Sequence, residues 1–379
     1  MKNRDSVTSM PRSGIREIMD LAWQTPNCLH LEVGEPDFGT PEHIREGGVR
    51  AIQEGKTRYT PNAGIPELRA ALADKIHRVN GYEVDAQQII VSSGAVEAIY
   101  ASLVTMLNPG DEILLPDPGW PNFRMMADLL SATIVYYPLR PENGFLPDPK
   151  DIANRITSRT KVLLVNFPSN PLGSVPTEGL LKQLYEVAQA HDLWIVSDEC
   201  YDQIVFEGTS PSPAVNDSDG RVISTYSFSK TYAMTGWRVG YAAVPRQVVD
   251  TLSKVQEPLI SCVSGPAQYA ALSALEGPQE CVTEMVDAYR SRRDAALAAC
   301  DERGLTYLVP RGAFYLWLSI EHRDSLKFAL DLVAKKKVAI APGSAFGDNG
   351  NGWVRISLAN NADSVVKGVQ AIADLRTES

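Results

Sequence analysis

Short apolar segments alternate with longer amphipathic segments from about residue 88 to residue 245. Short apolar runs are typical of strands buried on both faces of a sheet, and apolar residues spaced three or four apart indicate helices. The pattern predicts seven strands, at residues 89–91, 113–115, 133–137, 162–165, 194–197, 222–226 and 240–244. Helices are expected between them at residues 96–106, 123–130 and 177–191.

This alternation predicts the fold class. Strands that alternate with helices form strand–helix–strand units, which build a largely parallel sheet covered by helices on both faces. We therefore expect an α/β protein. Its large, ligand-binding domain would span residues 45–275 and contain a mostly parallel seven-stranded sheet sandwiched by helices.

The pattern changes after residue 265, where a long helical stretch runs to residue 300. The first 44 residues hold only fragments of a pattern and are too short to fold alone. We expect residues 1–44 and 276–379 to form a smaller α+β domain together. Its remaining elements would be strands at 306–308, 314–318, 338–341 and 354–358, a helix at 324–335 and a C-terminal helix.

The charge balance favours a small-molecule partner. The chain has 36 basic and 46 acidic residues, and its net charge of -10 disfavours contact with nucleic acid or anionic membranes. Residues 1–16 are polar, and no apolar run is long enough to span a bilayer. We therefore expect a cytoplasmic protein that binds neither nucleic acid nor membrane.

Cysteine and histidine spacing gives no support for a disulfide framework or a metal site. The five cysteines are odd in number, widely spread and without C-x-x-C spacing. The five histidines form no i, i+4 pair. We expect reduced thiols and chemistry without a metal.

Polar residues follow several of the predicted strands, at the sheet edge where open parallel sheets bind ligands. Lys230 follows the strand at 222–226. Desolvation of its ammonium would lower the pKa and make a neutral amine available to form an imine. Taken alone, such a lysine more often reaches solvent. Its neighbours Ser227, Ser229 and Arg238 change this balance, because two hydroxyls and a guanidinium suit a phosphate dianion.

A second phosphate-binding element is expected at Ser93, Gly94 and Ala95, where a strand passes through small residues into a helix. Backbone N–H groups at a helix start attract anions. The ordinary alternative is a helix N-cap without a ligand.

At this point a family resemblance becomes specific. Residues 227–240, Ser-Phe-Ser-Lys-Thr-Tyr-Ala-Met-Thr-Gly-Trp-Arg-Val-Gly, resemble the cofactor-lysine signature of the class I/II aminotransferases, which are pyridoxal-phosphate enzymes of fold type I. Seven further blocks resemble family blocks in the same order. They lie at residues 34–38, 59–64, 117–122, 170–173, 198–201, 312–315 and 354–357.

The resemblance implies roles around a pyridoxal 5'-phosphate cofactor. Lys230 would hold it as a Schiff base, and Asp198 would keep the pyridine nitrogen protonated so that the ring acts as an electron sink. Asn170 and Tyr201 would hydrogen-bond the phenolic oxygen of the ring, and Trp120 would stack on its face. Taken singly, Asp198 starts a loop, Asn170 marks a turn, and the two aromatic residues suit a core.

Three further residues are implied to complete the site. Arg355 lies in an apolar strand, where its guanidinium needs an anionic partner. The resemblance assigns the substrate α-carboxylate to it, with Asn170 and Trp120 also near the substrate, and a protein carboxylate is the alternative. Gly34 would allow close approach to the substrate. Tyr59 resembles a tyrosine that reaches the phosphate of a neighbouring subunit, which implies a homodimer with shared active sites.

The expected function is amino-group transfer between an L-amino acid and a 2-oxo acid by a ping-pong mechanism. The same cofactor can also support elimination, C–C bond formation or oxidation, and this alternative stays open. Outside enzymes, the alternative is the ligand-sensing module of a transcription regulator. Ala95 stands where one family branch selective for dicarboxylates has a lysine, and Leu172 replaces a threonine. Both departures bear on substrate preference.

Overall fold

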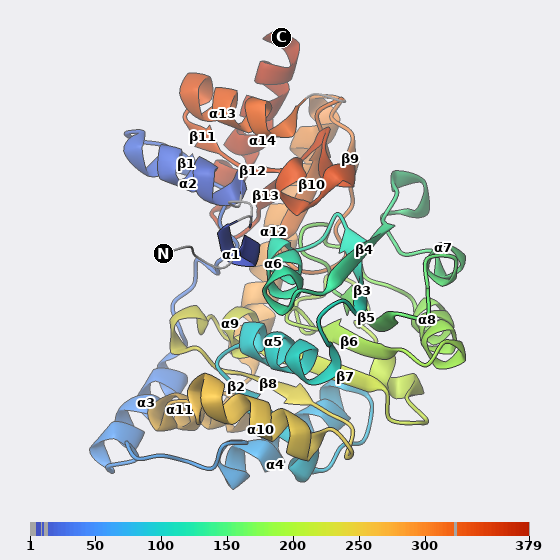
Figure 1. The fold of residues 1–379 in the computed structure, drawn as a ribbon. Helices are drawn as coiled ribbons and strands as arrows, with labels where there is room; N and C mark the ends of the chain where they lie inside the picture. The colour runs from blue at the N-terminus through green and yellow to red at the C-terminus, as the bar shows by residue number, and fades with distance from the viewer. Residues whose placement is uncertain (1–4, 9, 11–13, 322–323, 379) are drawn as a thin grey trace.

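A computed structural model describes residues 5–8, 10, 14–321 and 324–378 of the chain (Figure 1). Its largest element is a seven-stranded sheet with the order β2-β8-β7-β6-β5-β3-β4. All neighbouring strands are parallel except β8, which runs antiparallel to β2 and β7. The strands are β2 (Ile89–Ser92), β3 (Glu112–Asp117), β4 (Thr133–Pro138), β5 (Thr160–Asn166), β6 (Trp194–Asp198), β7 (Val222–Ser227) and β8 (Gly240–Ala243). The seven strands expected from the apolar runs are therefore confirmed.

Helices cover both faces of this sheet. In β3, Ile113 packs in one buried cluster with Ile99 of α5 (Ala95–Met106) and Phe123 of α6 (Pro121–Leu130). Its neighbour Leu114 belongs to a different cluster, with Leu181 of α8 (Glu178–Ala190). Successive residues of a strand point to opposite faces of the sheet. When helices cover both faces, the strand therefore needs an uninterrupted run of apolar residues. The predicted sandwich of a sheet between helices is confirmed.

The three helices predicted within this unit have their expected places, with ends shifted by at most two residues. The Thr177 hydroxyl explains one of these ends, because it accepts a hydrogen bond from the Leu180 amide and caps α8. Several helices were not predicted. They include α1 (Asp5–Thr8), α3 (Glu42–Gln53), α4 (Pro66–Lys75), α7 (Pro149–Ala153) and α10 (Val249–Ile260).

The long helical stretch expected up to residue 300 is confirmed, but it consists of two helices. It forms α11 (Gly265–Glu276) and α12 (Glu280–Glu302), separated by a break at Gly277 and Pro278. Proline has no N–H to continue the hydrogen-bond ladder, and Gly277 adopts an extended conformation. A Cβ at Gly277 would also collide with the ring of His43 near the start of α3.

A smaller unit holds a four-stranded antiparallel sheet with the order β12-β13-β10-β9 and a parallel pair, β1 with β11. The predicted strand at 338–341 divides between these two sheets. The helices α2, α13 and α14 lie around them (Figure 1). The elements are α2 (Gly14–Gln24), β1 (Leu29–His30), β9 (Tyr307–Leu308), β10 (Tyr315–Ser319), α13 (Ser325–Lys336), β11 (Val338–Ala339), β12 (Ala341–Pro342), β13 (Trp353–Ser357) and α14 (Ala362–Glu378).

The N-terminal segment joins this smaller unit through β1, which pairs with β11, and through α2, which contacts α13. The domain limits near residues 44 and 275 remain a prediction. None of the helices formed by residues 5–8, 14–321 and 324–378 is long and apolar enough to cross a membrane.

Candidate active site

A cavity of about 320 Å³ opens where the central strands end and the smaller unit begins. Its walls come from segments that are far apart in the chain, including those that follow β6 and β7 and the strands β10 and β13. The residues singled out from the sequence that line it are Gly34, Ala95, Trp120, Asn170, Asp198, Tyr201, Ser227, Ser229, Lys230, Arg238 and Arg355.

Lys230 is held at the end of β7 by a short helix, α9 (Phe228–Thr231). The Ser227 hydroxyl starts this helix by accepting a hydrogen bond from the Ser229 amide at 3.1 Å. The Lys230 Nζ donates to the backbone oxygen of Gly34 at 2.6 Å. Burial lowers the pKa of Lys230 to about 8, and Arg355 and Arg238 act in the same direction. The predicted decrease in this pKa is therefore confirmed.

Arg238 lies at the centre of a group suited to a phosphate. Its Nη1 donates to the Thr235 carbonyl at 2.8 Å and contacts the Ser229 hydroxyl at 3.4 Å. Its Nη2 donates to the Ser93 carbonyl at 3.3 Å. A Cβ at Gly94, which has φ +77°, would lie 2.5 Å from this nitrogen, so glycine permits the close approach. No ion pair between described residues uses Arg238, and its charge is available to an anion.

The turn before α5 differs from the expectation in one respect. The Ser93 amide donates to the Glu97 carboxylate at 2.5 Å, and the Gly94 amide donates to the Ser92 carbonyl at 2.9 Å. These two amides are therefore engaged within the turn. Desolvation raises the pKa of Glu97 to about 7.

Asp198 ends β6 and is buried next to the end of β7, where it pairs in register with Thr225. Its Oδ1 accepts a hydrogen bond from the Cys200 amide at 3.2 Å. Burial raises the pKa of Asp198 to about 6, whereas the contact with Cys200 and the charge of Lys230 oppose this increase. A cationic ligand atom beside the carboxylate would favour its ionised form.

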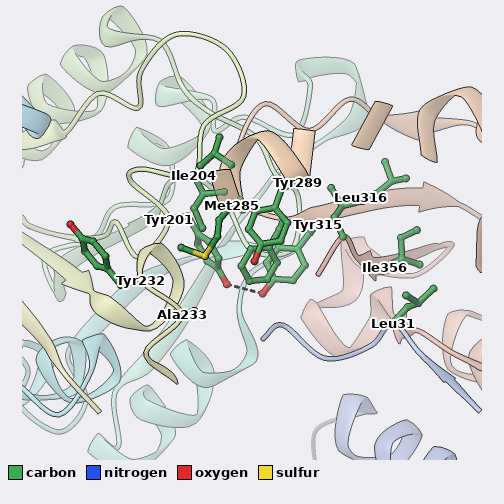
Figure 2. Close-up of a cluster of buried hydrophobic side chains, with 14 of the residues drawn as sticks. Leu31, Tyr201, Ile204, Tyr232, Ala233, Met285, Tyr289, Tyr315, Leu316 and Ile356 are labelled. Carbon is green, nitrogen blue, oxygen red and sulfur yellow. Dashed lines mark hydrogen bonds between the residues drawn. The ribbon is translucent and has the colours of Figure 1, made fainter. Parts of the chain in front are cut away.

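Tyr201 and Tyr315 bring the two units together at the cavity. Their hydroxyls are 2.7 Å apart, and Figure 2 shows them pointing toward each other. Both side chains are buried, and burial raises the pKa of Tyr201 well above its usual range. Tyr315 belongs to one of the resembling blocks, but no role was assigned to it from the sequence. An aromatic residue at the start of an apolar strand is typical of a hydrophobic core, so the local pattern does not indicate a functional role.

Arg355 is a buried cation without a carboxylate partner among the described residues. Its Nη1 donates to the Asn170 side-chain oxygen at 2.9 Å, and its Nη2 donates to the Glu32 carbonyl. Its Nε is buried without a hydrogen bond. The guanidinium lies 4.3 Å from the ring centroid of Tyr315. The alternative of an ion pair within the protein is not supported by these contacts.

Gly34 and Trp120 complete the walls of the cavity. A Cβ at Gly34 would overlap the Tyr315 hydroxyl. The Trp120 ring packs edge-to-face on Phe123, with centroids 5.3 Å apart.

Three predicted residues lie outside the cavity. Ser93 and Gly94 lie next to two lining residues, Ala95 and Arg238. Tyr59 is 92% exposed and lines no part of it. Conversely, several lining residues had no role predicted from the sequence, although Cys200 and Tyr315 lie in two of the resembling blocks. They include Ile15, Met19, Glu32, Val33, Cys200 and Tyr315.

The chain also resembles known proteins over nearly its whole length. Residues 26–372 match the family "Aminotransferase class I and II". The aspartate aminotransferase of Pyrococcus horikoshii is 35% identical over 97% of this chain and 95% of its own length. The aspartate/prephenate aminotransferase of Thermus thermophilus is 37% identical over 94% of this chain and 92% of its own length.

Solved structures agree with this assignment. The aspartate aminotransferase from Thermus thermophilus with maleate has a TM-score of 0.93 at 35% identity, and the match covers 99% of this chain and 100% of that one. A Pyrococcus protein has a TM-score of 0.96 at 34% identity, with 99% and 98% covered. With a sheet, a crevice and a buried lysine arranged as described, the chain belongs to the class I and II aminotransferase family.

Proposed function

We propose that this protein transfers amino groups between L-amino acids and 2-oxo acids with pyridoxal phosphate attached covalently to Lys230. Amino-group transfer is the activity of the family to which the chain belongs. One observation supports the rest of the proposal. Within the described residues, one cavity combines a buried amine of lowered pKa with the buried guanidinium of Arg355, which forms no ion pair with a described carboxylate.

The chemistry of the cavity walls fits this cofactor. Arg238 with the hydroxyls of Ser227 and Ser229 would hold the phosphate dianion. Asp198 would keep the ring nitrogen protonated, because the positive charge on that nitrogen and the negative charge of the Asp198 carboxylate stabilise each other. The polar groups of Asn170 and Tyr201 would contact the ring oxygen, and the Trp120 ring would lie against the cofactor ring.

When bound, the cofactor supplies an aldehyde carbon for covalent attachment and a ring that withdraws electrons from the substrate α-carbon. Arg355 would bind the substrate α-carboxylate and so hold the α-carbon near Lys230. The neutral amine of Lys230 would take the proton from that carbon and later deliver it. Because the same residues then serve the incoming oxo acid, we expect ping-pong kinetics.

Borohydride reduction followed by peptide mass mapping tests the attachment site. We expect a pyridoxyl-phosphate adduct on the peptide that contains Lys230, and an adduct elsewhere would contradict the proposal. Spectra recorded with a panel of amino acids test the outcome of the reaction. Accumulation of the aminated cofactor supports transfer, whereas release of ammonia without it would indicate elimination.

We also propose a homodimer with shared active sites. Tyr59 is 92% exposed, so a second subunit can reach its side chain. In sedimentation experiments we expect a dimer, and Tyr59→Phe should weaken cofactor binding without changing the dimer. All five cysteines are free, which fits the cytoplasmic location that we propose.

The lowered pKa of Lys230 predicts how covalent attachment depends on pH. With a pKa of about 8, roughly a tenth of the amines are neutral at pH 7 and about nine tenths at pH 9. The rate at which cofactor-free protein captures pyridoxal phosphate should therefore rise about tenfold from pH 7 to pH 9 and then level off. Stopped-flow absorbance measures this rate. A rate that keeps rising tenfold per pH unit above pH 9 would indicate an ordinary lysine.

Gly34 should tolerate no side chain. In Gly34→Ala the new methyl group would overlap the Tyr315 hydroxyl and displace the backbone oxygen that accepts from Lys230. Because a displacement of about 1 Å in an active site can cost about 100-fold, we expect kcat/KM to fall roughly 10- to 100-fold. Gly39→Ala is the matched control, since nothing lies within 4 Å of its position. Equal activities of the two variants would show that close approach at Gly34 is unnecessary.

A further inference from the structure

The cavity has an apolar part that the proposed reaction does not use. Ile15 and Met19 lie four residues apart on α2 and therefore present their side chains on one face of that helix. They reach the same cavity as the start of α5, which lies on the large sheet. The apolar lining residues without a role in the proposed reaction include Ile15, Met19, Val33 and Val96.

We propose that the preferred substrate carries an apolar, uncharged side chain, such as that of leucine or methionine, and that this lining contacts it. The inference rests on the proposed function, because it assumes that Arg355 holds the α-carboxylate and Lys230 the cofactor. It concerns the opposite end of the substrate, where the side chain must lie.

The cations of the cavity support this substrate class. Among the described residues its lining includes three, Lys230, Arg238 and Arg355. Lys230 donates to Gly34 and is proposed to hold the cofactor. Arg238 lies among the phosphate-binding hydroxyls, and Arg355 is proposed to bind the α-carboxylate. In the described lining, no cation is left for a second carboxylate on the substrate.

An acidic residue of the cavity wall acts in the same direction. Glu32 is fully buried in the wall; its Oε1 lies 2.8 Å from His30 Nδ1, and its Oε2 has no hydrogen-bond partner. A distal carboxylate would lose its hydration and approach Glu32 without a compensating cation. An apolar side chain would instead gain by leaving water.

Leucine and aspartate provide a matched pair for the test, because two methyl groups replace two carboxylate oxygens at the same branch point. We expect the holoenzyme to convert its cofactor to the aminated form with leucine at a kcat/KM at least about tenfold above that with aspartate. Asparagine, the neutral counterpart of aspartate, should also react faster than aspartate. Titration calorimetry should show tighter binding of 4-methylpentanoate than of succinate, independently of turnover.

Two variants place a cation in the apolar lining. Met19→Lys and Val96→Lys should each shift the ratio of leucine to aspartate activity at least about tenfold toward aspartate. Gln24→Lys is the matched control for Met19→Lys, because it adds the same charge to an exposed position of α2 that lines no part of the cavity. It should leave the ratio unchanged. Met19 is half-buried whereas Val96 is 38% exposed, so Val96→Lys tests the inference even if Met19→Lys disturbs folding.

The possible results separate this inference from the proposed function. If no amino acid converts the cofactor, the proposed function itself fails. If amino acids react but aspartate reacts faster than leucine, only the substrate class is overturned, including the case in which a neighbouring subunit supplies a cation. A ratio that Met19→Lys and Val96→Lys leave unchanged would also overturn it.

Discussion

Lys230→Ala should reduce transamination at least about 10⁴-fold, because the positioned base that moves the α-proton is lost together with the covalent attachment of the cofactor. Lys230→Arg should be equally inactive. A guanidinium stays protonated at all accessible pH values and can neither attack the aldehyde nor accept a proton. Steady-state rates and the absorbance of bound cofactor would measure both effects.

The control for this substitution is Lys327→Ala, which removes an exposed lysine of α13 that lines no part of the cavity. It should retain full activity and the full absorbance of bound cofactor. Near-normal turnover in Lys230→Ala would refute the assignment of the catalytic amine.

Arg355→Met should lower kcat/KM by about 10²- to 10³-fold for every amino acid and oxo acid. Losing one partner of a buried, hydrogen-bonded charge pair costs about 2–5 kcal/mol. The loss should be independent of the substrate side chain, since every substrate shares the α-carboxylate. Arg355→Lys should recover only part of the activity, because an ammonium cannot donate two parallel hydrogen bonds to a carboxylate.

Thermal unfolding of the substrate-free protein separates binding from stability for Arg355. No described carboxylate pairs with this guanidinium, and its Nε lacks a partner, so the unliganded protein gains no ion-pair energy from it. We therefore expect a small change in Tm beside a large change in kcat/KM. A large decrease in Tm with unchanged KM would mean that Arg355 serves the fold alone.

The apolar runs predicted the sheet well because a strand that is buried on both faces needs apolar residues at nearly every position. Ile113 and Leu114 pack on opposite faces, so a run without polar interruption was needed at β3. The break between α11 and α12 was missed, because apolar spacing continues on both sides of Gly277 and Pro278. The strand at 338–341 was predicted as one piece, yet its two halves join different sheets. Hydrophobic period reports burial and does not identify the partner strand.

The amino-acid order was enough to predict the α/β class, the seven strands and the lowered pKa of Lys230, because each depends on local pattern and burial. Which distant groups meet at that lysine was decided by folding in three dimensions. Gly34 reaches Lys230 only because β1 pairs with β11, and Tyr315 reaches Tyr201 only because β10 lies beside the end of the large sheet. Such contacts depend on strand order and on how the two units pack. The spacing of apolar residues along the chain predicts neither of them.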